Sequence, residues 1–109
     1  MPVRGRPLWA IQVSSTAASV SVTNTRNVEI YNNQLYFSSS SGTFLGISSI
    51  GTGLPTTASL TPTLQINMGI GASPYGFVMF STGSAGAGVL DLAYVADDRV
   101  TAGGGLQKW

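Results

Sequence analysis

The chain has 109 residues, of which five are basic and four are acidic, so its formal net charge is +1. So small and scattered a charge gives no electrostatic footprint for nucleic acid, and we expect no nucleic-acid partner. Cysteine and histidine are both absent. The chain therefore has no disulfides, no thiolate metal site and no imidazole for acid–base catalysis, and we expect neither enzymatic activity nor a cofactor.

The sequence also bears on location. No run approaches the roughly 20 apolar residues of a membrane span, and the apolar stretch at residues 8–11 is too short for the core of a signal peptide. Solubility must depend on Ser, Thr, Asn and Gly, a composition that suits secreted and cell-surface β-proteins. We expect an extracellular or cell-surface protein whose export signal lies outside this sequence.

Short runs of β-branched and aromatic residues occur along the whole chain, whereas helical periodicity is nearly absent. These runs predict strands at residues 8–13, 19–23, 27–31, 34–38, 44–50, 63–67, 75–81, 91–96 and 105–109. The sequence therefore predicts an all-β fold.

The strongest local signal is the stretch NVEIYNNQLYFSSSSGTFLGI. Asn32 and Asn33 stand between two alternating runs, and Asn tolerates positive φ, so the pair predicts a two-residue hairpin turn. Residues 38–43 then form the next turn, and Phe44 begins a third strand. The pattern predicts a three-stranded antiparallel meander.

The two halves of the chain share one order of elements. In the first, VEIY is followed by LYFS, a polar turn and FLGI; in the second, YGFVMF is followed by a glycine-rich loop, LAYVA, another glycine-rich turn and LQKW. Tyr36 and Tyr94 correspond, 58 positions apart. A period of about 50 residues with about four strands is typical of β-propeller blades. A generic sandwich or barrel is the alternative.

On this interpretation the chain has three parts. Residues 1–25 form an N-terminal arm and outer strands, residues 26–62 a first four-stranded antiparallel meander, and residues 63–109 a second meander that is either complete or truncated. The fold class is thus all-β, with about two propeller-like blades from a larger propeller.

The stretches RNVEIYNNQLYFSSSSG, IGTGLPTT, SPYGFVMF and LAYVADDR…GGGLQKW resemble repeats of large bacterial extracellular proteins of poorly defined function, and also resemble NHL-like propeller repeats. The chain departs from the pattern at Ala93, where a bulkier residue is usual. The resemblance implies propeller blades and little about chemistry. Because known rings need about four to eight blades, we expect a fragment of a longer gene, or alternatively a protomer that assembles.

Asp97 and Asp98 form the chain's one pair of adjacent acidic residues. They are a candidate Ca²⁺ site, because hard cations take several oxygen ligands. The pair lacks an alternating carboxylate pattern, however, and the favoured interpretation is that Asp ends a strand and bonds the backbone of its own turn. No catalytic residue is predicted.

Three aromatic residues, Tyr75, Tyr94 and Trp109, are candidates for ligand binding through stacking on sugar rings, with core packing as the alternative. For Trp109 we expect a partly exposed ring at the end of a strand that pairs with residues 92–96. The sequence thus favours a non-catalytic interaction module whose partners are neighbouring blades or other protomers. A small oligomerising glycan-binding protein is the alternative, and the ligand is a glycan or a protein.

Overall fold

The computed structural model describes residues 22–57 and 60–109, and these contain seven β-strands and no helix. The strands are β1 (Thr25–Tyr31), β2 (Gln34–Ser41), β3 (Phe44–Ile50), β4 (Pro62–Asn67), β5 (Pro74–Phe80), β6 (Leu92–Asp97) and β7 (Gly105–Lys108). The all-β prediction is confirmed.

The strands form two antiparallel sheets, each a simple meander in chain order. Sheet A has the order β1-β2-β3-β4, and sheet B has the order β5-β6-β7. The β1–β2 turn is the predicted one: Asn32 and Asn33 have φ angles of 50° and 59°, both in the left-handed region that the tightest hairpins require.

One boundary differs from the prediction. Residues 63–67, which the sequence analysis assigns to the second unit, lie in β4, and β4 pairs with β3, so that Ile66 is opposite Ile47. The Gly- and Pro-rich segment before β4 is thus a wide connection within sheet A. The predicted strand 8–13 lies outside the described residues, as does most of 19–23, whose described residues Val22 and Thr23 are not in a strand.

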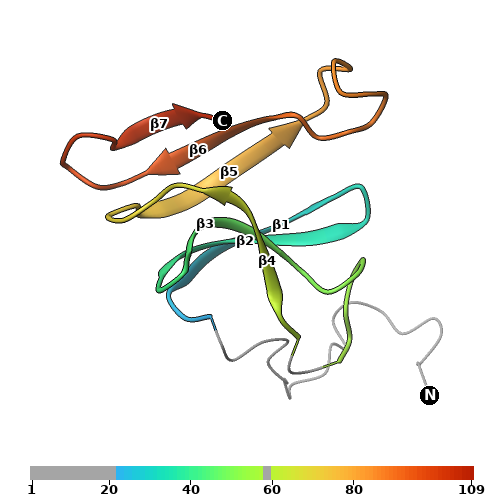
Figure 1. The fold of residues 1–109 in the computed structure, drawn as a ribbon, viewed down its shortest axis with the longest axis horizontal. Helices are drawn as coiled ribbons and strands as arrows, with labels where there is room; N and C mark the ends of the chain where they lie inside the picture. The colour runs from blue at the N-terminus through green and yellow to red at the C-terminus, as the bar shows by residue number, and fades with distance from the viewer. Residues whose placement is uncertain (1–21, 58–59) are drawn as a thin grey trace, which may run out of the picture.

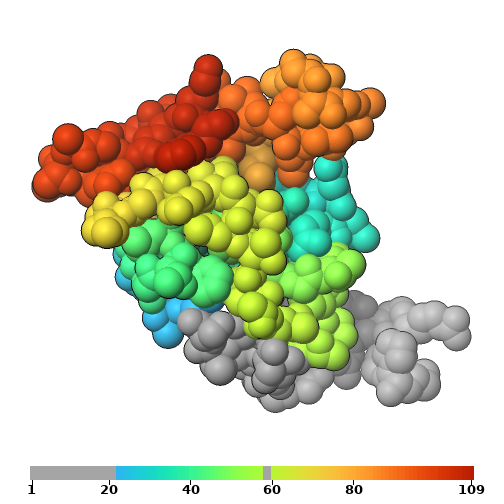
Figure 2. All heavy atoms as spheres, in the orientation of Figure 1, coloured from blue at the N-terminus to red at the C-terminus, as the bar shows by residue number. Residues whose placement is uncertain are grey.

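The two sheets stack face to face, as two layers in Figure 1, and in Figure 2 the orange and red atoms of sheet B lie directly on the yellow and green atoms of sheet A. β5 is the strand of sheet B that approaches β1, β2 and β3. The buried core between the layers consists of Ile47, Met68, Ala72, Phe77 and Val95. A second cluster, Val22, Phe37 and Ile50, lies on the opposite face of sheet A.

The first three strands of each sheet have the same register. Glu29 lies opposite Tyr36 in sheet A, as Val78 lies opposite Tyr94 in sheet B. On the next strand, Tyr36 faces Ser49 and Tyr94 faces Lys108. Tyr36 and Tyr94 are therefore equivalent, as the sequence predicts.

Two further details repeat. The register shifts between Thr25 and Asn27 in sheet A and between Pro74 and Phe77 in sheet B, which is the same place in the first strand. A diagonal aromatic pair also recurs. The rings of Tyr31 and Tyr36 lie 6.1 Å apart, and those of Phe80 and Tyr94 lie 6.2 Å apart. Sheet B thus repeats the first three strands of sheet A.

Candidate functional site

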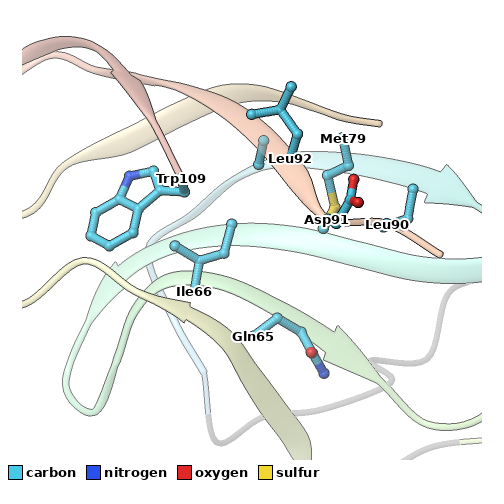
Figure 3. A pocket seen from close by; sticks show the side chains of 8 residues that line it. Gln65, Ile66, Met79, Leu90, Asp91, Leu92 and Trp109 are labelled. Carbon is cyan, nitrogen blue, oxygen red and sulfur yellow. The ribbon is translucent and has the colours of Figure 1, made fainter. Parts of the chain in front are cut away.

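One hollow, here called the first hollow, lies between the sheets and has a volume of about 210 Å³. Ile66 of β4 forms one wall, Met79 and Ala93 form the other, and Trp109 closes one end (Figure 3). Trp109 follows β7, and its backbone N–H and C=O pair with Ala93. Alternation along β7 directs the indole toward β4, because successive side chains point to opposite faces.

Two polar groups stand at the rim of this first hollow, Gln65 and Asp91. The Asp91 carboxylate accepts hydrogen bonds from the Thr82 hydroxyl at 2.6 Å, the Thr82 backbone N–H at 2.7 Å and the Ala85 backbone N–H at 3.2 Å. These bonds, first that of the Thr82 hydroxyl, lower the pKa of Asp91 below its ordinary value of 3.8. The rim is therefore anionic at neutral pH.

The second hollow, of about 320 Å³, lies where β1 of sheet A borders sheet B, next to the side chains of Val78, Tyr94 and Leu106. Its walls are Asn27, Glu29, Gly76, Phe77, Val78, Tyr94, Ala96 and Leu106. The pairing of β5 with β6 shifts in register between Pro74 and Phe77. Gly76, which lies within this shift and has no side chain, lines the hollow. The hollow is mostly apolar, with the Asn27 amide donating to the Glu29 carboxylate at 3.3 Å at its edge.

The side of sheet B turned away from sheet A, here called the outer face of sheet B, carries the exposed side chains of Val78, Phe80 and Leu106 together with the half-buried Tyr94. Leu106 is 77% exposed and Phe80 is 47% exposed. Large apolar side chains gathered on one exposed face mark an interaction surface more often than a lone exposed residue does.

Tyr75 lies apart from both hollows. Its side chain is exposed, and the Arg26 guanidinium sits 4.4 Å from the centre of its ring. The same guanidinium donates to the Ser73 hydroxyl at 3.1 Å and to the Pro74 carbonyl at 3.3 Å. This contact ties β1 to the start of β5, and one face of the Tyr75 ring is already occupied by the cation.

Asp97 is 2% exposed and is bonded within the protein. Its carboxylate accepts the backbone N–H groups of Ser73 and Arg99 and the Gln107 amide. The Arg99 Nε lies 3.2 Å from Asp97 Oδ2 without hydrogen-bond alignment. Asp97 therefore accepts hydrogen bonds from the turn that follows β6, in agreement with the favoured interpretation. The positive charge of the neighbouring Arg99 guanidinium disfavours a bound cation at this carboxylate.

Asp98 follows directly after the end of β6 and is exposed, whereas Asp97 is buried. Among the described residues no three acidic side chains gather in a way that could hold a metal ion.

The structure does not bring the three predicted aromatic residues into one site. Trp109 lines the first hollow, Tyr94 lines the second on the opposite face of sheet B, and Tyr75 lines neither. Sequence reasoning missed Val78, Phe80 and Leu106. For Val78 and Phe80 a signal was present, because YGFVMF is apolar at nearly every position, and such a run indicates a strand with two apolar faces.

Comparison of the chain with models of protein families finds no match, and neither the search of curated proteins nor that of solved structures finds one. The propeller resemblance therefore remains a hypothesis. Within residues 22–57 and 60–109, no helix has the length and apolar character to cross a membrane.

Proposed function

We propose that this chain is a non-catalytic, β-propeller-like interaction module of a secreted or cell-surface bacterial protein. The observation that supports it is the repeat of register, bulge and aromatic pair in two consecutive sheets that stack face to face. A structure built from repeated stacked sheets presents broad faces and loop-lined rims for binding. The absence of His and Cys from the sequence agrees with a binding role.

The first experiment reads the DNA on either side of this reading frame. A propeller module predicts in-frame units of about 50 residues, each with a meander whose middle strand carries an aromatic residue. In-frame sequence without such units would contradict the proposal.

A second experiment tests location. A protease added to intact cells that produce the tagged protein should remove the tag, since the proposal places the module outside the membrane. A tag that is cleaved only after cell lysis would contradict a secreted or surface location.

Glycan binding is the second candidate function, and the first hollow supports it. The hollow has an indole at one end and a carboxylate at the other (Figure 3), and so combines an apolar platform with a hydrogen-bond acceptor, as small-molecule sites commonly do. At about 210 Å³ the hollow suits one small ring. On a glycan array, this function predicts binding that Trp109→Ala abolishes and that Val100→Ala, at an exposed position outside the hollow, leaves intact. An array without binding would exclude it.

A further inference from the structure

The contact between the two sheets uses a defined face of each. From sheet A it uses Tyr31, Tyr36 and Ile47, and from sheet B it uses Phe77 and Val95. The Tyr31 and Phe77 rings lie 6.5 Å apart. The contact is directional, because sheet A offers one side and sheet B offers the opposite side of an equivalent meander.

The shared register shows where the same two faces recur. The equivalents of Tyr31, Tyr36 and Ile47 in sheet B are Phe80, Tyr94 and Leu106. These three lie on the outer face of sheet B, and their aromatic pair has the spacing of the pair that meets Phe77. The outer face of sheet B therefore resembles the face of sheet A against which sheet B packs.

The complementary face recurs on sheet A. Phe77 and Met79 of β5, which pack against sheet A, correspond in register to Val28 and Ile30 of β1. These two are not covered: Val28 is 60% exposed and Ile30 is 55% exposed. Phe37, equivalent to Val95, is buried beside them in the second cluster. In the part of the chain that the structure describes, Val28 and Ile30 thus expose part of one face, and the outer face of sheet B exposes the other.

We propose that a second copy of this chain docks head to tail, with Val28 and Ile30 of its β1 against Val78, Phe80, Tyr94 and Leu106 on the outer face of sheet B. The new contact continues the one already present inside the chain. It deepens the proposed function by naming the partner, and it rests on that function. A heterologous contact leaves one free surface at each end, so association continues into a ring if the rotation closes and into an open filament if it does not.

The second hollow fits this arrangement. It lies next to Val78, Tyr94 and Leu106 of the outer face of sheet B, where β1 borders sheet B. A bulky side chain of the incoming β1 has a recess to enter there, as Phe77 enters the layer beneath Tyr31 within the chain. Central apolar anchors in such recesses carry most of the binding energy of an interface.

The experiment uses two variants of the full chain. One, Val78→Asp with Leu106→Asp, blocks the outer face of sheet B; the other, Val28→Asp with Ile30→Asp, blocks the β1 surface. All four positions are exposed, and circular dichroism verifies that each variant folds. Sedimentation velocity should show a self-associating wild type and monomeric variants, each at least about tenfold weaker in self-association. Mixing the two variants should restore a dimer of one chain of each kind, because each retains the surface the other lacks.

The control is Ile70→Asp, at an almost fully exposed position outside both surfaces, which should associate like the wild type. A monomeric wild type, a blocked variant that still self-associates, or a mixture that stays monomeric would each overturn head-to-tail docking. If a double variant fails to fold, the mixing experiment is repeated with the single variants Val78→Asp and Val28→Asp. Failure here leaves the tests of flanking sequence and location unaffected, so the two proposals fail separately.

Discussion

At the scale of single residues, Gly46 controls how closely β3 and β4 approach. It lies opposite Asn67, and its φ of 151° is one that other residues rarely adopt. A Cβ built on Gly46 would collide with the backbone carbonyl of Ile66. The absence of a side chain is therefore a requirement of this strand pair.

Gly46→Ala should lower the free energy of unfolding by about 2–3 kcal/mol, because a backbone clash adds to an unfavourable φ. Gly42→Ala is the matched control: Gly42 has a φ of 56° and no atom within 4 Å of the added Cβ. It should cost about 1 kcal/mol, the strain of the left-handed conformation alone. Urea unfolding measures both, and equal losses would argue against the close approach.

Asp91 gives a prediction on pH. Its pKa is lowered in the folded state, chiefly by the Thr82 hydroxyl. The resulting stabilisation is therefore fully present above the ordinary value of 3.8 and is lost as pH falls through the lower folded pKa. Unfolding of the wild type and Asp91→Asn should differ most at neutral pH, and the difference should disappear in acid. A difference that grows in acid would contradict this sign.

At the scale of elements, the edge strand β7 predicts a small role for Trp109 in stability. The residue is 44% exposed, and its pairing with Ala93 uses backbone atoms. Trp109→Ala should cost less than about 1.5 kcal/mol, whereas Phe77→Ala, in the core between the sheets, should cost about 3–5 kcal/mol. Thermal or urea unfolding compares the two, and similar losses would show that Trp109 is part of the core.

The strands themselves could be predicted because alternation and turn residues are local. Asn32 and Asn33 specify their hairpin, and the predicted strand 44–50 is β3 as the structure has it. The sheet to which β4 belongs could not be predicted in this way. The Gly- and Pro-rich connection before β4 is compatible with a return to β3 or with the start of a new sheet. The pairing of Ile66 with Ile47 places β4 beside β3 in sheet A.

Less of the candidate site followed from the sequence. Tyr94 and Trp109 were identified as aromatic residues, but they point to opposite sides of sheet B and line different hollows. A hollow arises from how two sheets stack, which depends on packing between distant residues. The alternation of residues along a strand does not show which distant strands pack together, so the sequence did not predict that Gln65 and Ile66 line the same hollow as Trp109.

At the scale of the whole molecule, one apolar layer holds the two sheets together. Ile47 is fully buried in it, and it contacts neighbours from both sheets. Ile47→Ala should cost about 2–5 kcal/mol, and it should lower the unfolding midpoint of both sheets in one transition. Ile70→Ala, at an exposed position, should change stability by less than about 0.5 kcal/mol.

Because the sequence also contains Trp9, the fluorescence of Trp109 is read in a Trp9→Phe variant, where it reports on sheet B. Adding Tyr36→Trp and Trp109→Phe to that variant places the single probe in sheet A. Coincident transitions at the two probes are expected, because the sheets share a core. Separate transitions would show that the sheets fold independently and that Ile47 does not couple them.

The two versions of the meander differ in the lengths of their connections. Two residues join β1 to β2, whereas residues 81–91 join β5 to β6, yet the strand pairing is the same. By loop-closure entropy the longer connection costs only about 1.5 kcal/mol more. The chain therefore shows by its own repeat that this hairpin end tolerates guest sequence. A foreign epitope grafted between Asn32 and Asn33 would be displayed on a rigid sheet, which makes the meander usable as a carrier for peptide presentation.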